Sequence, residues 1–485
     1  MRSVLRNHKK KLIALVAIPV VALVAHLVVG AATSMSPPIV SLQVGPPVVG
    51  DEPIRRVDDS YTRLWGGVRE VYLQGGPEQL GAAHSRLLYD HMIKNEGELW
   101  GTFEHFVPTG VARALIMDTS RVQYRHVDDG IPVARKQELA AEALGLSPDP
   151  FDGKMATYQR LVFLHAVYDI ALSFEHSPLI GCSAFGLGAS VTADGHVLVG
   201  RAFDFEAGDV FDTDKAVFFV RENGRIPYAS VAWPGMTGVL TGMNSEGVMI
   251  LVNGGRARAP RTKGIPVVFA LREVMQGAHD TSEAVEILKH QDVMVSHIVF
   301  VADAKGKFAI VERAPGEPAF VRDTFADPDR VAVTNHFEGP FADDPKNQAV
   351  RAGTSTIARR DRLDEMLAAL APLSADSKTA VAMLRDHQCS KGRACALGDR
   401  REIDALIATH GVVADTTDRV LWVSHGPHLS GAFVRFDLKK IFAAGHDPSH
   451  DGEAELIGED PILRDGRYED GRKRAGGPKA GGDGP

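Results

Sequence analysis

Cys182 is the residue whose type and setting point most directly to chemistry. It stands in the segment LIGCSAF (residues 179–185), which precedes a turn at Asp194-Gly195 and a returning segment GRAFDF (residues 200–205). A thiol can attack the carbonyl group before it, and cleavage of the Gly181-Cys182 bond would leave Cys182 at a new N-terminus. The freed α-amine, with an ordinary pKa of about 8, can then act as general base for its own sulfur. Gly181 and Cys182 are therefore a candidate autocleavage site.

Arg201 and Asp204 lie on the returning segment, which a β-hairpin would bring back beside Cys182. A nearby Arg can lower the pKa of a thiol, and the thiolate is the attacking species. The Asp carboxylate can hold the ammonium form of the new α-amine. The alternative is that Cys182 is a small buried residue and that Arg201 and Asp204 form a surface ion pair.

Two asparagines follow apolar segments that are typical of strands. Asn253 comes after VMILV (residues 248–252) and before two glycines, and Asn335 ends the segment VAVTN (residues 331–335). An amide at the end of a strand suits an oxyanion-hole donor. A simple turn residue is the alternative at both positions.

Together these motifs resemble the N-terminal nucleophile (Ntn) hydrolases, and within them the isopenicillin N acyltransferase-like group (acyl-coenzyme A:6-aminopenicillanic acid acyltransferase). Choloylglycine hydrolases, penicillin V acylases and acid ceramidases are more distant relatives. The resemblance extends from about Val71 to Leu438, with Ala202 where the family usually has Asn. It implies an α+β fold, a four-layer αββα sandwich with an N-terminal helical segment. It also implies an autoproteolytically processed hydrolase or acyltransferase that acts on linear amide C–N bonds of small-molecule substrates without a cofactor.

A further arginine is carried over from the same resemblance. The segment STIARRDRL (residues 355–363) is similar to the family's Ser-x-x-x-Arg stretch at the head of a helix, which assigns the active-site Arg to Arg359. Arg362 lies one helical turn away and is the open alternative. The catalytic set implied in this way is Cys182, Arg201, Asp204, Asn253, Asn335 and Arg359.

Composition and charge limit the partners. Of the 485 residues, 44% are hydrophobic and 24% are charged, which is ordinary for a globular protein. The net charge of −8, from 62 acidic and 54 basic residues, argues against a nucleic-acid partner. The expected partners are a small amide or acyl substrate and the α and β chains cut from the same precursor.

The N-terminus is typical of an export signal. Five basic residues precede an apolar run from Leu12 to Ala32 that is nearly long enough to span a bilayer. Gly30-Ala31-Ala32 offers small residues for signal cleavage, so a cleaved signal and a membrane anchor both remain open. In either case the catalytic part lies outside the cytoplasm, in the cell envelope, the periplasm or the extracellular space.

The other two cysteines fit that compartment. Cys389 and Cys395 can close a short disulfide loop in an oxidising space, which leaves Cys182 unpaired. A metal-binding pair is the alternative, but no second pair of ligands lies nearby in the sequence. We expect no metal in the site.

Two other classes of protein compete with this interpretation. A metallohydrolase would use the pair His425 and His428 or the pair His165 and Asp169, although neither has a third ligand at a recognisable spacing. A non-catalytic envelope protein could keep the fold as a binding module.

The predicted organisation has five parts. These are a signal or anchor at 1–34, a linker at 35–70, a mostly helical α-chain region at 71–181, a catalytic β-chain region at 182–440 and a disordered tail at 441–485. One apolar helix is predicted from Tyr158 to Leu172, and later helices at about 266–276, 282–290, 356–370 and 377–386.

Overall fold

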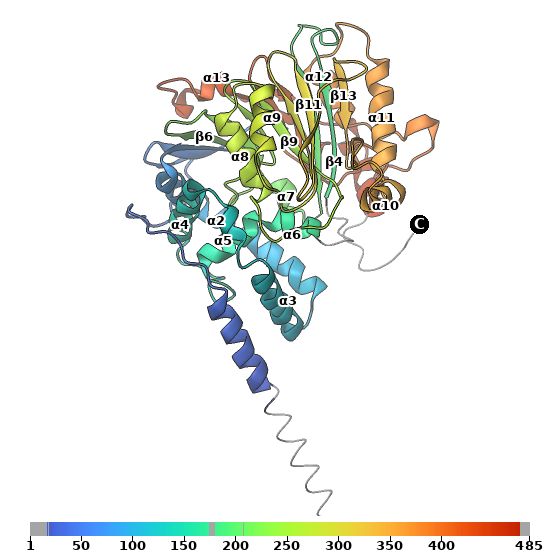
Figure 1. The fold of residues 1–485 in the computed structure, drawn as a ribbon. Helices are drawn as coiled ribbons and strands as arrows, with labels where there is room; N and C mark the ends of the chain where they lie inside the picture. The colour runs from blue at the N-terminus through green and yellow to red at the C-terminus, as the bar shows by residue number, and fades with distance from the viewer. Residues whose placement is uncertain (1–16, 18, 174–179, 207, 476–485) are drawn as a thin grey trace, which may run out of the picture.

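The computed structural model describes residue 17 and residues 19–173, 180–206 and 208–475. Within them, two β-sheets face each other and helices cover their outer sides (Figure 1).

The larger sheet has ten strands and is antiparallel except where β3 runs parallel to β6. In spatial order its strands are β1 (Ile54–Val57), β2 (Ser60–Trp65), β3 (Val68–Gly75), β6 (Ala216–Glu222), β7 (Tyr228–Ala232), β8 (Thr241–Asn244), β9 (Met249–Gly254), β10 (His297–Ala302), β11 (Phe308–Arg313) and β12 (Phe320–Arg322).

The smaller sheet has seven antiparallel strands and carries the hairpin that contains Cys182. In spatial order its strands are β13 (Arg330–Val333), β4 (Ile180–Leu187), β5 (Leu198–Phe205), β14 (Ala408–Asp415), β15 (Val420–Ser424), β16 (Phe433–Asp437) and β17 (Leu456–Ile457).

Helices precede, connect and follow these strands. The α-helices are α2 (Pro77–Phe106), α3 (Gly110–Gln123), α4 (Val133–Gly145), α5 (Thr157–His165), α6 (Val167–Ser173), α7 (Val210–Thr213), α8 (Val267–Gly277), α9 (Thr281–Lys289), α10 (Pro345–Gly353), α11 (Thr356–Ala369), α12 (Ser377–Leu384), α13 (Leu438–Ile441) and α14 (Arg467–Ala475). The short 3-10 helices are η1 (Val127–Gly130), η2 (Ser390–Gly392), η3 (Pro448–His450) and η4 (Pro461–Leu463).

Three apolar clusters separate four layers. One cluster fills the space between the two sheets, where inward-facing side chains of both sheets meet. A second lies between the ten-stranded sheet and helices that include α2, α8 and α9. A third lies between the seven-stranded sheet and α11 and α12. This order of helix, sheet, sheet and helix is the predicted α+β αββα sandwich, and the prediction of the fold class is confirmed.

The prediction of a linker at residues 35–70 was wrong in its second half. The segment 35–70 was expected to be a linker, but its second half forms β1, β2 and the start of β3. These strands pair with one another and then with β6, so strands from before and after the proposed cut share one sheet. Pairing with β6 satisfies the backbone groups of β3 that a free linker would expose to water.

Two further predictions needed correction. The helix expected from Tyr158 to Leu172 is two helices, because the backbone leaves helical geometry at Ala166 between α5 and α6. The tail predicted to be disordered from 441 contains β17, which pairs with β16, and the helix α14. Arg472 of α14 donates to the Leu406 carbonyl, which holds that helix on the body. Residues 476–485 lie outside the described residues.

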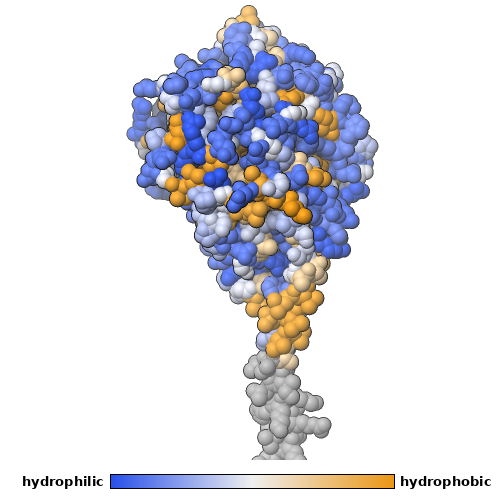
Figure 2. Space-filling model, turned by 90° about the vertical axis from the view of Figure 1, so that its left-hand side faces the viewer, coloured by the Kyte–Doolittle hydropathy of each residue, from blue (hydrophilic) through white to orange (hydrophobic). Residues whose placement is uncertain are grey.

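The first part of the predicted export segment also lies outside the described residues. Residues 19–32 form a helix that projects from the body (Figure 1). Several of its apolar side chains are exposed, among them Val21 at 66% and Leu27 at 62%, and they form a continuous apolar surface in Figure 2. Among the helices of the described residues, none is both long and apolar enough to cross a membrane.

Candidate active site

The hairpin of β4 and β5 places Cys182 directly opposite Phe203, and Gly181 opposite Asp204. Side chains alternate between the two faces of a strand. Arg201 and Phe203 therefore share the inner face with Cys182, whereas Asp204 lies on the outer face beside Gly181. The three-residue spacing of Arg201 and Asp204 thus sends them to opposite sides of the strand.

On the side that faces β13, the backbone of Cys182 forms hydrogen bonds with side chains rather than with another strand. Strand β13 ends at Val333, which pairs with Ala184, and continuing the register places Asn335 opposite Cys182. The Cys182 N–H donates to Asn335 Oδ1 at 2.8 Å, and the Cys182 carbonyl accepts from Arg359 Nη1. This edge of β4 therefore has no strand partner at the nucleophile.

Arg359 of α11 connects three parts of the site. Besides the Cys182 carbonyl, it donates to Ser183 Oγ and to Asn335 Oδ1, both at 2.9 Å. Arg362, the open alternative, instead binds Asp386 through two nitrogens, at 2.7 and 2.8 Å. The structure brings Arg359 to Cys182 and directs Arg362 elsewhere.

Arg201 is fully buried and reaches across to β9. Its guanidinium donates to Asn253 Oδ1 and, at 2.6 Å, to the Val252 carbonyl. The Asn253 amide in turn donates to the Thr334 carbonyl at 2.9 Å. Both ends of the Asn253 side chain are thus engaged, and in the uncut chain it positions Arg201 and the end of β13 rather than offering a free oxyanion donor.

The thiol of Cys182 is buried, and burial raises its pKa above the ordinary value. Arg201 and Arg359 act in the opposite direction, as does a hydrogen bond from the Gly254 backbone, but burial is the largest effect. Arg201 does act to lower the pKa of the thiol, as expected. Desolvation raises that pKa by more, and this larger effect was not expected. No sequence pattern marks the Gly254 N–H, because every residue except proline has a backbone donor.

Asp204 is packed against the bond that would be cut. A Cβ at residue 181 would lie 2.8 Å from Asp204 Oδ2, so only glycine fits there without displacing the carboxylate. Burial raises the pKa of Asp204, and its Oδ1 atom has no hydrogen-bond partner within the described part of the chain. A new ammonium group at Cys182 would supply a partner for a carboxylate in this position.

Neither histidine pair that motivated the metallohydrolase alternative gathers metal ligands. His165 Nε2 accepts from the Thr237 N–H at 2.8 Å, and His428 Nδ1 lies 2.9 Å from the Ala408 carbonyl. In the described residues, the groups of potential ligands are Cys389, Cys395 and Asp399, and Asp194, His196 and Asp415. Neither group includes those histidine pairs.

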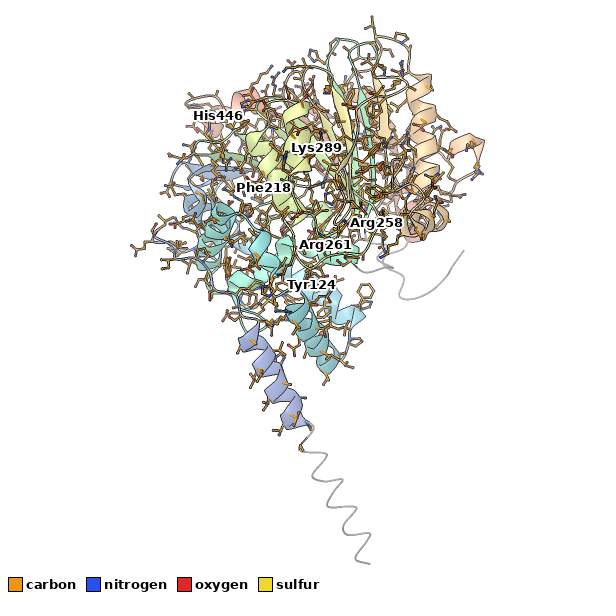
Figure 3. The ribbon with its side chains drawn as sticks, in the orientation of Figure 1. Tyr124, Phe218, Arg258, Arg261, Lys289 and His446 are labelled. Carbon is orange, nitrogen blue, oxygen red and sulfur yellow. A yellow bond between two sulfur atoms is a disulfide. The ribbon has the colours of Figure 1, made fainter. Side chains whose placement is uncertain are left out.

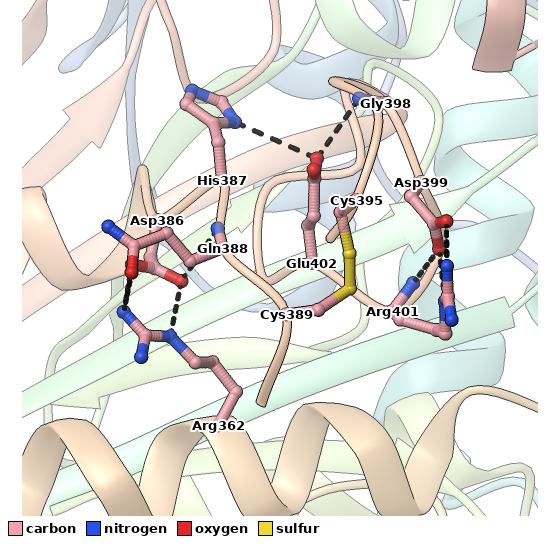
Figure 4. Close-up of a disulfide and its surroundings, with 10 residues drawn as sticks. All are labelled: Arg362, Asp386, His387, Gln388, Cys389, Cys395, Gly398, Asp399, Arg401 and Glu402. Atoms are coloured by element: carbon pink, nitrogen blue, oxygen red, sulfur yellow. Dashed lines mark hydrogen bonds and ion pairs between the residues drawn. A yellow bond between two sulfur atoms is a disulfide. The ribbon is translucent and has the colours of Figure 1, made fainter. Parts of the chain in front are cut away.

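Cys389 and Cys395 are joined by a disulfide, with Cα atoms 5.8 Å apart, and Cys182 is free (Figure 4). The disulfide loop lies next to Glu402, whose carboxylate accepts from the Gly398 N–H at 3.0 Å. It also lies near α11, the helix that carries Arg359 and Arg362.

Two cavities are lined by residues that neighbour the contacts of Cys182. A cleft of about 550 Å³ is lined by Gly255, the residue after the Gly254 donor, and by basic residues that include Arg258. Figure 3 shows Arg258 near α6, whose last residue, Ser173, also lines this cleft. The second cavity, of about 90 Å³, is apolar and is lined by Phe203, the residue opposite Cys182.

A family model matches the part of the chain that carries most of the candidate site residues. Residues 191–410 match the family model described as acyl-coenzyme A:6-aminopenicillanic acid acyl-transferase. The match includes Arg201, Asp204, Asn253, Asn335 and Arg359 and begins after Cys182. The predicted resemblance to the Ntn hydrolases and their isopenicillin N acyltransferase-like group is confirmed, and it supports the general class of hydrolases and acyltransferases.

One further protein is similar to part of the chain. An uncharacterized protein of Archaeoglobus fulgidus is 23% identical over 265 residues, which are 50% of this chain and 42% of that protein. The chain thus spans less than half the length of this relative.

Solved structures that are similar to the chain include an N-acylethanolamine-hydrolyzing acid amidase ortholog from Caenorhabditis elegans (TM-score 0.37, 17% identity, covering 49% of this chain and 93% of that one). A conjugated bile acid hydrolase variant from Clostridium perfringens has a TM-score of 0.36 and 13% identity, covering 57% and 97%. Penicillin V acylase from Agrobacterium tumefaciens has a TM-score of 0.34 and 16% identity, covering 58% and 98%.

Proposed function

We propose that this protein is a cysteine amidohydrolase or acyltransferase that cleaves its own Gly181-Cys182 bond. Cys182 then acts as an N-terminal nucleophile on linear amide C–N bonds. One observation carries the proposal. The N–H and the carbonyl of Cys182 are held by the side chains of Asn335 and Arg359 at an edge of β4 that has no strand partner there. These side-chain bonds can hold Cys182 in place after the chain is cut, although the cut falls within the β4–β5 ladder, in which Gly181 pairs with Asp204.

The self-cleavage step moves one acyl group from nitrogen to sulfur. The Cys182 sulfur attacks the Gly181 carbonyl carbon, the C–N bond breaks, and the nitrogen takes up the proton that the thiol gave up. Water then hydrolyses the thioester, which releases Gly181 as a carboxylate and restores the thiol. Asp204 lies beside this bond and stabilises the ammonium form of the new amine.

The processed enzyme repeats this chemistry on a substrate. The α-amine of Cys182 accepts the thiol proton, the sulfur attacks the amide carbonyl, and the α-amine returns a proton to the leaving nitrogen. The Gly254 N–H bonds the Cys182 sulfur, and we assign it as the donor that stabilises the oxyanion. Asn335 accepts from the Cys182 N–H through Oδ1 and donates to the Gly254 carbonyl through Nδ2, so it positions the nucleophile relative to that donor. Water or an acceptor amine then takes the acyl group from sulfur.

The test begins with purified wild-type protein and its Cys182→Ala variant. Wild type should give two fragments of about 20 and 33 kDa, at about 110 Da per residue, and Cys182→Ala should stay whole. N-terminal sequencing of the larger fragment should begin at Cys182. A panel of N-acyl amides, with and without an amine acceptor, then measures turnover and separates hydrolysis from acyl transfer.

Cleavage at another bond, or equal cleavage of the Cys182→Ala variant, would refute the self-processing step. Turnover that persists in Cys182→Ala and is lost with a chelator would instead favour a metallohydrolase. A folded, processed protein that turns over no amide would support the binding-module alternative.

We also propose that the protein is exported from the cytoplasm. This proposal is supported by the five basic residues before the apolar run and by the exposed apolar side chains of the helix at residues 19–32. Fractionation of the producing cells, with N-terminal sequencing of the smaller fragment, distinguishes a cleaved signal from a retained anchor.

A further inference from the structure

The apolar cavity lined by Phe203, the residue opposite Cys182, has walls from both sides of the proposed cut. Helices α2, α5 and α6 contribute Met92, Leu161 and Tyr168, and the catalytic region contributes Phe203, Trp233 and Met236. The aromatic rings of Phe203 and Trp233 lie 6.0 Å apart. A pocket with such walls binds an apolar group, and methionine side chains can adjust to its shape.

Two polar side chains in this cavity lack partners. Asn95 on α2 is 3% exposed, and neither its Oδ1 nor its Nδ2 atom has a hydrogen-bond partner in the described structure. Tyr168 on α6 is 5% exposed, and its hydroxyl is also unpaired there. A buried polar group without a partner is unfavourable, so both positions are suited to a ligand that completes their hydrogen bonds.

Tyr168 is the polar wall residue that interacts with Cys182. It belongs to the same apolar cluster as Cys182 and Phe203, and it interacts electrostatically with the thiol. Burial and this interaction keep its pKa well above the ordinary value, so the hydroxyl remains a neutral donor. Asn95 lies on another helix, and its amide can both donate and accept.

We infer that this cavity is the acyl site of the enzyme and that it selects a short apolar acyl group carrying one hydroxyl or oxo group. Asn95 binds that polar group, and the Tyr168 hydroxyl donates to the substrate amide at Cys182. The inference rests on the proposed function and specifies its substrate class. The small volume of about 90 Å³ favours an unbranched chain or a single ring over a bulky polycyclic group.

The experiment uses pairs of acyl amides of one chromogenic amine. Each pair consists of a hexanoyl or octanoyl amide and one derivative that carries a single hydroxyl or oxo group. The position of that group moves along the chain from one pair to the next. The wild-type enzyme should prefer at least one derivative over its plain partner by about ten-fold or more in kcat/KM. In Asn95→Leu, which keeps the size of the side chain, the preference ratio should fall to about one or below.

Tyr168→Phe should act differently from Asn95→Leu. It should lower kcat/KM for both members of each pair by about ten-fold and leave their ratio unchanged, because its hydroxyl binds the amide that all these substrates share. Tyr158→Phe is the matched control. Tyr158, on α5, is another buried tyrosine with an unpaired hydroxyl, but it does not line this cavity.

A second measurement does not depend on turnover. Calorimetric titration of wild-type protein with hexanoic acid and its hydroxy and oxo derivatives should show tighter binding of one derivative, and Asn95→Leu should abolish the difference. No preference in wild type by either measurement, or a preference that survives in a folded Asn95→Leu variant, overturns the inference and leaves Asn95 as a residue that only binds water. Absence of self-cleavage and of all turnover would count against the proposed function, while the titration still tests the pocket.

Discussion

Replacement of Arg359 by methionine is the sharpest test of how the site is built. Arg359 is almost fully buried, and its guanidinium donates to the Cys182 carbonyl and to Asn335 Oδ1, the same oxygen that accepts from the Cys182 N–H. Hydrogen bonds to a charged group contribute about 1.5–3 kcal/mol each. Loss of two such bonds at the reacting residue corresponds to about 3 kcal/mol or more, which is at least about a hundred-fold in rate.

The assay follows self-cleavage over time by denaturing gel and mass spectrometry, together with thermal melting. Arg362→Met is the matched control, because Arg362 lies one turn further along the same helix and its side chain is 16% exposed in an ion pair with Asp386. Such partly exposed pairs contribute about 0–1 kcal/mol, so this variant should cleave at the wild-type rate.

Two results would refute the reasoning. One is a folded Arg359→Met protein that cleaves as fast as wild type, and the other is an equal loss of rate in Arg362→Met. If Arg359→Met fails to fold, Arg359→Lys keeps the charge with fewer donors, and it should cleave at an intermediate rate.

The remaining predictions concern stability. Gly81→Ala should destabilise the protein by several kcal/mol, because the new Cβ would lie 2.0 Å from a backbone carbonyl of α4, whereas Gly101→Ala on the same helix meets nothing within 4 Å and should stabilise by up to about 1 kcal/mol in denaturant unfolding. Burial lowers the pKa of His165 to about 4, so its contribution to stability should be present above pH 6.5, the ordinary pKa of the imidazole, and disappear as pH falls towards 4. Melting temperatures should therefore fall less steeply over that interval in His165→Gln than in wild type, and parallel curves would contradict this. Cys389→Ser should lower the free energy of unfolding by about 2 kcal/mol through loss of a short loop closure. Non-reducing mass spectrometry of the wild type should find the peptide linked to Cys395, and two free thiols would contradict the pairing.

Local sequence patterns were sufficient for much of this fold. The helices α8, α9, α11 and α12 were predicted within two residues of their observed ends, because each has an apolar repeat bounded by turn residues or caps. The edge strand β1 and its neighbour β2 were missed. Their residues include many charged and polar side chains, and only pairing with β3 shows that they belong to the sheet.

The sequence by itself determined the candidate nucleophile Cys182, the glycine before it and the two asparagines that come after apolar segments, because these features depend on residue type and short spacing. The tertiary structure decided which residues meet. The alternation of side chains sends Arg201 inward and Asp204 outward, the end of β13 leaves the Cys182 backbone to Asn335 and Arg359, and the turn of α11 selects Arg359 over Arg362. Asn95 and Tyr168 carry no motif at all. They are candidates for the acyl site because packing buries their polar groups in an apolar cavity without hydrogen-bond partners in the described structure. A local sequence pattern cannot show that a buried polar group lacks a partner.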